Sequence, residues 1–346
     1  MMEIRSIDPL TDPQWLPFLD ATPGATVFHH PQWIAPLMEA YRYTPASLGC
    51  FDGGTLVGVL PLLEIRSRLT GRRAVSLPFS DYGGSVAVSD DVHTLLLDAA
   101  LARGRERGLA FIEMRSEIEH AFACRSGAYK RHQLELGQDP DRLMKAFDKS
   151  QTQRGLNKFL KSGGVVERRT DNEGLRTFMQ MNYVTRRKHG LPPQPDRFFD
   201  GFQKHLMDRG MGFVSIARLG EQVLAACVFM RYKDTLYYKY GASDDEGLVH
   251  RPNHGIMWDA MRYGIAEGIR ILDFGRSDLD GEGLIKFKRG WGTIETDITY
   301  AQVGTVARPA GGGSGGGILD RLKPVIQRMP VPVLKVIGQV LYEHVG

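Results

Sequence analysis

Apolar residues recur along this chain with two different spacings, and their alternation predicts a protein built from both strands and helices. Runs such as 54–63 and 221–230 are short, apolar and preceded by a turn glycine, which is typical of strands. Stretches such as 91–107 and 172–188 carry apolar residues every three or four positions, which predicts amphipathic helices.

The same reasoning places the remaining elements. In the first half we expect strands at 46–51, 55–65, 74–78 and 110–115 around the helix at 91–107. In the second half we expect helices at 140–161, 172–188, 196–208 and 253–267, and strands at 164–168, 212–218, 221–232, 235–241, 270–275 and 296–303. Neighbouring strands outnumber crossover helices, so the predicted fold class is α/β (α+β), with mixed, largely antiparallel sheets flanked by helices.

An internal similarity links the two halves. Residues 95–117 and 256–278 each show the pattern of a helix, a glycine stop and a short strand. Aligned without gaps, the two segments match at their polar ends, where Arg115 corresponds to Arg276 and Ser116 to Ser277. The similarity favours a duplicated unit, although helix–glycine–strand patterns are also common in unrelated α/β proteins.

Length and composition suit about two domains, since the chain has 346 residues, of which 42% are hydrophobic and 24% charged. We expect a first domain over 1–139, a second over 140–306, a Gly/Ser-rich linker over 307–317 and a basic amphipathic tail over 318–346. The tail has two interpretations: it packs on a domain or a partner, or it lies on an anionic membrane face.

Several features favour a cytoplasmic protein. No run of about 18 apolar residues predicts a membrane span, and residues 1–10 lack the pattern of a signal peptide. The three cysteines, Cys50, Cys124 and Cys227, are too far apart to indicate a disulfide framework or a zinc site. If the tail binds lipid, we expect the protein at the inner face of the membrane.

Basic residues concentrate in one region although the whole chain has a net charge of only +4. Residues 149–169 carry six basic side chains against one acidic side chain. Arg154, Lys158 and Lys161 share one helical face there, and Arg187 and Lys188 end the next helix, so both are candidate contacts for a polyanion such as tRNA. The alternatives are a solvated stripe and favourable placement at a helix C-terminus. No RNA-binding module is evident, and we expect no DNA binding.

Common catalytic signatures are absent from the sequence, including phosphate loops, the G-x-G-x-x-G and G-x-S-x-G motifs, and H-E-x-x-H. His250 and His254 have the spacing of two metal ligands on one helix face. Pro252 lies between them, however, and favours a loop and first helical turn instead. We therefore expect no metal site.

Two glycine-rich segments combine charges with aromatic residues, and glycine permits the close approach of a ligand. In 77–84, Asp81 and Tyr82 lie among Pro, Phe and Gly, which suits a base or an amine-binding carboxylate; the alternative is a turn aspartate. In 273–292 a strand enters a charged loop whose lysines neighbour aromatic residues, which suits oxyanion or phosphate binding; the alternative is a solvated loop.

Several motifs together resemble a known family. They are FHHPQW (28–33), LPFSDYGG (77–84), the basic helix over 154–161, TRRKHGLPPQ (185–194), YYKYGAS (237–243), RPNHGIMWDA (251–260), LDFGRSD (272–278) and GLIKFKRGWG (283–292). Their order over about residues 1–305 resembles the branch of the GNAT superfamily that contains the Fem-type peptidoglycan-bridge aminoacyltransferases. The likeness is greatest to the Fem-like acyltransferases found beside exopolysaccharide and exosortase systems.

The resemblance implies two tandem GNAT-like domains and transfer of an acyl or aminoacyl group to an amine. It implies that Lys288, in the Phe287–Lys288 pair, steadies the oxyanion and that Asp81 contacts the attacking amine. Residues of the matching motifs are expected to bind substrate: Arg276, Asp273, Tyr240, Tyr82, Phe287, Trp291, Asn253 and Lys286.

The resemblance also implies a co-substrate, either acyl-CoA or aminoacyl-tRNA, with no tightly bound cofactor. The acceptor would be an amine-bearing glycan or muropeptide precursor of the cell envelope. Two departures bear on the donor, because neither a helical-hairpin insertion nor the R/Q-x-x-G-x-G/A pyrophosphate loop is found. The alternative hypothesis is a non-catalytic adaptor at the membrane surface that binds a glycan precursor or an export partner.

Overall fold

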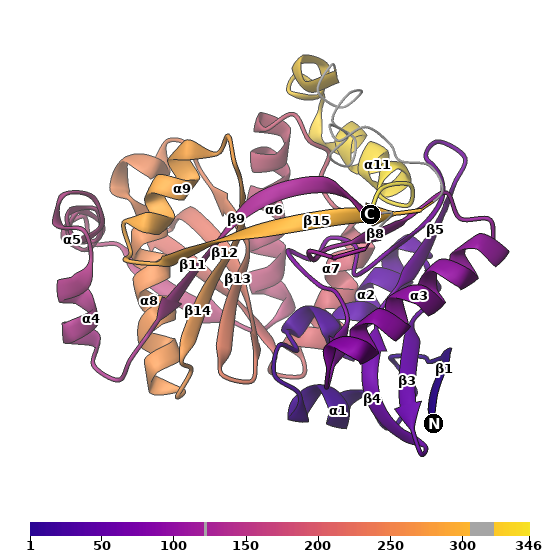
Figure 1. Cartoon of the computed structure of the whole chain (residues 1–346). Coiled ribbons are helices and arrows are strands. Elements are labelled where there is room, and N and C mark those ends of the chain that lie inside the picture. The colour runs from indigo at the N-terminus through magenta and orange to yellow at the C-terminus, as the bar shows by residue number, and fades with distance from the viewer. Residues whose placement is uncertain (121–122, 305–321) are drawn as a thin grey trace.

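A computed structural model describes residues 1–120, 123–304 and 322–346. The chain forms two lobes that share one long sheet (Figure 1). The first half contains β1 (Met2–Ser6), α1 (Trp15–Ala21), η1 (Val27–His29), α2 (Pro31–Tyr41), β2 (Thr44–Pro45), β3 (Leu48–Asp52), β4 (Thr55–Leu60), β5 (Leu63–Ser67), β6 (Gly71–Val75), β7 (Val86–Ala87), α3 (Asp90–Glu106), β8 (Ile112–Met114) and β9 (Ala123–Glu135).

The second half begins with α4 (Pro140–Ala146), η2 (Lys149–Gln153) and α5 (Arg154–Lys161). It continues with β10 (Val165–Arg169), α6 (Asn172–Lys188), α7 (Asp196–Phe202), η3 (Gln203–Met207), β11 (Gly212–Leu219), β12 (Gln222–Tyr232), β13 (Thr235–Ser243), η4 (Gly247–His250), α8 (Pro252–Ala266), β14 (Ile271–Asp278), α9 (Glu282–Arg289) and β15 (Ile294–Val303). The C-terminal helix is α11 (Val331–Leu341).

The sheets are mixed and largely antiparallel, as predicted. One sheet has the order β10-β11-β12-β13-β14-β9-β15-β8-β6-β5-β2, and a smaller one has the order β1-β3-β4-β7. The parallel pairs are β13 with β14 and β6 with β8. In each pair a helix, α8 or α3, lies between the two strands in the chain, so the two similar segments seen in the sequence occupy matching positions in the two lobes.

Two long strands join the lobes. β9 pairs with β14 on one side and with β15 on the other, and β15 continues on to pair with β8. Figure 1 shows both strands running across the molecule between the lobes. The sheet thus runs continuously through the predicted domain boundary at 139/140, which stays a prediction.

Aromatic residues of α2 and α7 pack across the lobes. Trp33 and Tyr41 of α2 contact Phe198 of α7, with ring centroids 6.1 and 5.7 Å apart. All three side chains are buried in one core cluster that draws on both halves of the chain. Burial of this much aromatic surface fixes the relative position of the lobes.

Some predicted elements are divided in the structure. The strand expected over 55–65 is interrupted at Pro61, which lacks an N–H group for the ladder, and becomes β4 and β5. The helix expected over 140–161 becomes α4 and α5, with the Asp148 side chain capping the intervening turn. The charged loop expected after β14 contains the helix α9, and the sequence reasoning assigned no strand to β9.

The described part of the predicted tail packs on the protein. Leu334 and Gly338 of α11 are buried, α11 contacts α6, and Lys335 pairs with Asp196 at 2.6 Å. The predicted linker, 307–317, and residues 318–321 lie outside the described residues. Within 1–120, 123–304 and 322–346 no helix is both long and apolar enough to cross a membrane.

Candidate active site

A cavity opens where two parallel strands stop pairing. β13 and β14 are hydrogen-bonded only as far as Tyr237 and Asp273, and both strands continue beyond that point. The cavity measures about 560 Å³, a size typical of small-molecule sites. Its walls come from the ends of β13 and β14, the 79–81 loop, α9 and the C-terminal segment.

Gly275 makes room for a carboxylate in this gap. Its φ is +67°, and a Cβ atom here would lie 2.6 Å from Oδ2 of Asp81. The pairing of β14 with β9 is irregular between Asp273 and Arg276, so β14 bends at this glycine. The backbone of the second lobe thus fits closely around an acidic side chain of the first lobe.

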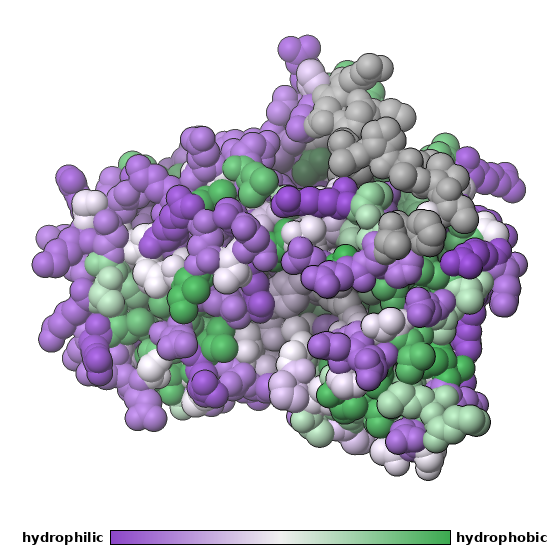
Figure 2. All heavy atoms as spheres, in the orientation of Figure 1, coloured by the Kyte–Doolittle hydropathy of each residue, from purple (hydrophilic) through white to green (hydrophobic). Residues whose placement is uncertain are grey.

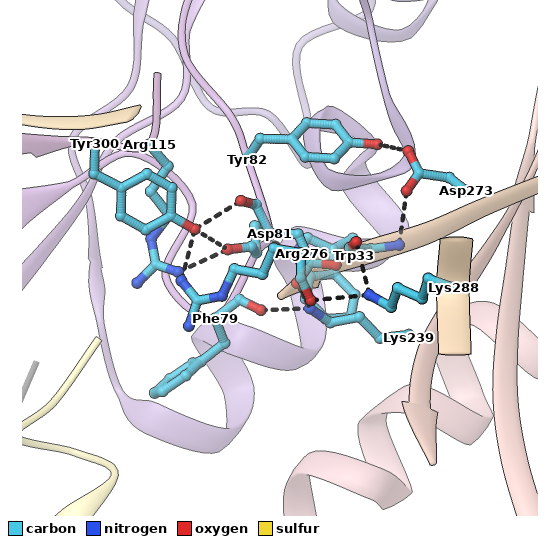
Figure 3. A network of polar contacts seen from close by, with 12 residues as sticks. Trp33, Phe79, Asp81, Tyr82, Arg115, Lys239, Asp273, Arg276, Lys288 and Tyr300 are labelled. Atoms are coloured by element: carbon cyan, nitrogen blue, oxygen red, sulfur yellow. Dashed lines mark hydrogen bonds and ion pairs between the residues drawn. The ribbon is translucent and has the colours of Figure 1, made fainter. Parts of the chain in front are cut away.

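Lys239, which lies on β13, holds the Asp81 side chain in place (Figure 3). Its Nζ atom donates to Oδ1 of Asp81 and to the carbonyl of Phe79, each at 2.8 Å. Burial alone would raise the pKa of Asp81, but the charges of Lys239, Arg276 and Lys288 lower it below the usual range. Asp81 is therefore an ionised carboxylate, better suited to orient an amine than to remove its proton.

Lys288 lies on the other side of the bend in β14. The side chain extends from α9, is 1% exposed, and donates to the carbonyls of Gly275 and Arg276 at 3.0 and 3.2 Å. Burial lowers the pKa of Lys288 to about 8, although Asp81, Asp273 and Asp278 oppose the shift. An ammonium has three N–H bonds, so one remains for a substrate atom.

The 77–81 loop is held in a conformation that non-glycine residues rarely adopt. Leu77 and Phe79 have φ values of +57° and +59°. The Tyr300 hydroxyl donates to the Asp81 carbonyl at 2.6 Å and accepts from Arg276 at 2.8 Å. Arg115 donates to the Ser80 carbonyl at 2.7 Å, so groups from both lobes fix the loop.

Behind the loop is a second polar cluster. The Tyr82 hydroxyl donates to Asp273 at 2.7 Å, and Arg131 donates to the same carboxylate while its guanidinium lies 4.0 Å from the Tyr82 ring centre. Asp273 is fully buried, and Tyr82 lines a separate cavity of about 280 Å³. These two predicted site residues anchor the loop from outside the main cavity.

The predicted residues divide into two groups by position. Lys288, Asp81, Arg276 and Tyr240 line the cavity together. Phe287 and Trp291 instead pack with His254 in the core of the second lobe, since they extend from a different face of α9 and its C-terminal turn than Lys288 does.

Asn253 and Lys286 also lie away from the cavity. Asn253 donates to the Ser243 hydroxyl at 3.3 Å beside the start of α8, and Lys286 is exposed. The two histidines with metal-ligand spacing have separate surroundings, because His250 bonds Ser162 while His254 is buried. Nowhere in the described part of the chain do three His, Cys, Asp or Glu residues gather as metal ligands would.

The predicted polyanion contacts lie on a surface apart from the cavity. Arg154, Lys158 and Lys161 are exposed on α5, at the far end of the second lobe, where hydrophilic side chains dominate (Figures 1 and 2). Lys188 pairs with Asp245, and neither it nor Arg187 lines the cavity.

Sequence reasoning missed several residues that build the site: Arg115, Lys239, Tyr300, Arg131 and Arg186. Arg186 precedes Arg187, a predicted polyanion contact, and lines the cavity from the end of α6. The internal similarity gave one usable signal, since it aligned Arg115 with Arg276. Lys239 and Tyr300 lie in the middle of strands and act through atoms of the distant 79–81 loop.

Part of the second lobe is similar to a known protein family. Residues 147–289 match the family described as Acetyltransferase (GNAT) domain. A stretch of 76 residues is 36% identical to the lipid II:glycine glycyltransferases of Staphylococcus epidermidis and Staphylococcus aureus. That stretch covers 20% of this chain and 18% of the length of those relatives.

Solved structures show the same tandem architecture. FemX superposes with a TM-score of 0.69 at 18% identity, covering 94% of this chain and all of that one. A tandem GNAT protein from the clavulanic acid biosynthesis pathway gives a TM-score of 0.52 at 13% identity over 89% of this chain and all of its own length. At these identities the likeness establishes the fold.

Proposed function

We propose that this chain, in which residues 147–289 match a GNAT domain and the fold resembles that of FemX, transfers an acyl or aminoacyl group to an amine. The observation that carries the proposal is Lys288. This buried lysine has its pKa lowered to about 8 and lies at the strand gap beside an ionised carboxylate. Perturbed titratable groups that converge in a cavity are typical of catalytic sites.

The geometry suits direct attack of the amine on the acyl carbonyl. Asp81 orients the amine, its nitrogen forms a bond to the carbonyl carbon, and the carbonyl electrons become an oxyanion. The free N–H of Lys288 donates to that oxyanion. Collapse of the intermediate breaks the bond to the leaving thiol or ribose hydroxyl, which takes the proton released by the amine.

Charge in the cavity supports an acidic acceptor. The guanidinium groups of Arg115, Arg186 and Arg276 line it together with Lys288. Such groups bind carboxylates and phosphates well, which suits an amine-bearing glycan or muropeptide precursor of the cell envelope. The similarity to glycyltransferases that act on lipid II supports the same class of acceptor.

The donor is either acyl-CoA or an aminoacyl-tRNA. In the experiment, full-length protein is incubated with labelled acetyl-CoA, or with tRNA charged with labelled amino acids, together with amine-bearing envelope precursors. We expect label in the precursor fraction and a loss of at least 100-fold in Lys288→Met. Lys286→Met is the matched control, since this exposed lysine lies two residues away on α9. Absence of transfer from both donors would contradict the proposal.

One observation favours the alternative of a membrane-surface adaptor at the cytoplasmic face. Val333, Val336 and Val340 form an exposed stripe on α11, between 46% and 60% exposed. Such a stripe suits shallow insertion into a bilayer. Flotation with phosphatidylglycerol vesicles tests it: binding that Val336→Glu abolishes, without any transfer of label, supports the adaptor.

A further inference from the structure

The C-terminal segment Val331–Gly346 reaches from the surface of α6 to the cavity lined by Asp81 and Lys288. Its last residues line the cavity alongside the 79–81 loop: Leu341, Tyr342, Val345 and Gly346. In Figure 1 α11 lies along the upper side of the molecule, and the C-terminus lies beside β8. A part of the chain distant in sequence from both lobes thus supplies one wall of the site.

Hydrogen bonds from side chains of the first lobe to main-chain carbonyls of the segment hold it in place. The Tyr43 hydroxyl lies 2.6 Å from the carbonyl of Tyr342 and 2.5 Å from that of Val345. Thr70 and Arg73 both donate to the carbonyl of His344. Because these contacts use main-chain atoms, they fix the path of the segment whatever its side chains are.

Side-chain contacts attach the segment to the second lobe as well. Arg197 pairs with Glu343 at 2.6 Å, and Arg186 donates to the Tyr342 hydroxyl at 2.5 Å. That hydroxyl in turn donates to the carbonyl of Pro192. The segment therefore bridges the two lobes at the cavity.

The Tyr342 ring also contacts the 79–81 loop. Its centroid lies 5.3 Å from that of Phe79, whose carbonyl accepts from Lys239. The cavity thus has an ionic end at Asp81 and Lys288 and an apolar end. The apolar end is formed by Phe79, Leu191, Pro192, Leu341 and Val345, with the Tyr342 ring among them.

We propose that Tyr342 and Val345 are specificity-determining residues, whose side chains limit the size of the apolar group that can enter beside Lys288. The inference rests on the proposed function in that it takes Lys288 as the group that binds the oxyanion of the acyl carbonyl. Small acyl groups reach the lysine without displacing the wall, whereas long acyl chains collide with the Tyr342 ring and Val345. This assigns the site to short acyl groups or small aminoacyl side chains.

The test uses Lys288 itself as the reporter. At pH 8 a large fraction of a lysine with a pKa of about 8 is unprotonated and attacks p-nitrophenyl esters, forming an amide and releasing p-nitrophenolate. Full-length protein is treated with p-nitrophenyl acetate or p-nitrophenyl octanoate, and acylation of Lys288 is quantified by peptide mass spectrometry. Rates are divided by those of free Nα-acetyl-lysine with each ester.

We expect the wild type to react at Lys288 at least tenfold faster with the acetate than with the octanoate. Tyr342→Ala and Val345→Ala should raise the octanoate rate at least fivefold and change the acetate rate less than twofold. Val345→Trp should lower the octanoate rate further. Val165→Ala is the matched control, because this valine is 65% exposed on β10 and does not line the cavity.

If the alanine variants changed the acylation rates of both esters by the same factor, the proposal would be overturned. The segment would then limit access to Lys288 regardless of acyl length. Unchanged ratios in both alanine variants would also overturn it, as would absence of acylation at Lys288 by either ester. The result is separable from that of the transfer assay, because ester acylation needs neither the natural donor nor the acceptor.

Discussion

Replacing Lys288 by methionine should make the protein more stable at neutral pH while abolishing turnover. Methionine has a similar length and removes the ammonium group from a site that is 1% exposed. Burial, the largest cause, lowers the pKa of Lys288 from 10.5 to about 8, so the folded state disfavours the charged form. Keeping this lysine charged therefore costs folding free energy.

The cost depends on pH with a definite sign. Below pH 8 the lysine is charged in both the folded and unfolded states, and a pKa difference from 10.5 to about 8 is a penalty of about 3 kcal/mol at pH 7. Between the two pKa values the unfolded state binds more protons than the folded state, so the penalty shrinks with rising pH. At pH 10 it is about 1 kcal/mol.

Methionine also leaves two carbonyls, those of Gly275 and Arg276, without this donor. Each lost hydrogen bond costs about 1 kcal/mol. Lys288→Met should therefore stabilise the protein by about 1 kcal/mol at pH 7 and destabilise it by about 1 kcal/mol at pH 10.

Urea denaturation followed by tryptophan fluorescence at pH 7, 8, 9 and 10 measures this difference. Other groups titrate over the same range, but they do so in both proteins and cancel in the comparison. A difference between variant and wild type that stays constant from pH 7 to pH 10 would refute the reasoning, because it would mean that Lys288 keeps an ordinary pKa.

Further substitutions test the rest of the site. Gly275→Ala places a methyl group 2.6 Å from Asp81 Oδ2 at a φ of +67°; steady-state kinetics should show at least a tenfold higher KM for the acceptor amine, and an unchanged KM would separate Asp81 from amine binding. Asp81→Asn leaves Lys239 buried without its counter-ion and should destabilise the fold by about 3 kcal/mol in urea denaturation at pH 7. Because the pKa of Asp81 is lowered, this difference should shrink as the pH falls through the acidic range. Reversing the charges of Arg154, Lys158 and Lys161 should weaken tRNA binding at least tenfold in filter assays at low salt while leaving ester acylation of Lys288 unchanged; equal tRNA affinity would remove α5 from donor binding.

The regular elements of the second lobe were predictable because their apolar periodicity is strong. The helix expected over 172–188 has those bounds in the structure as α6, and the strands β11 to β14 lie within a few residues of their expected positions. Matching polar residues also related Arg115 to Arg276, which both line the cavity. Local pattern was sufficient for these elements, but not for α1 and α2, which also pack on a core and to which the sequence analysis assigned no helix.

The pattern failed where polar side chains face a cavity inside the protein. β9 lies in the middle of the long sheet, yet its residues include Tyr129 and Arg131, which line cavities rather than a core. A strand of this composition has no apolar signal. α9 was missed for a related reason, since its glycines and charges suggested a loop while Lys288 is buried among carbonyls.

The Asp81–Lys239 pair shows a further limit. These residues are 158 positions apart and belong to different lobes. The motif containing Asp81 indicated a functional carboxylate, but the identity of its partner depends on how β13 approaches the first lobe. An ion pair between residues so far apart in the sequence is set by tertiary packing, and it cannot be predicted from their spacing in the sequence.

The long strands β9 and β15 have a consequence for how this protein can be divided. A fragment cut to the GNAT match at residues 147–289 would retain β14 but lose both strands that extend the sheet beyond it. The open edge of β14 would then offer its unpaired amides to other chains, a common origin of aggregation. Because one sheet runs through both lobes, we expect them to unfold in a single cooperative transition. Gene fragments cut at residues 147 and 289 are poor candidates for expression.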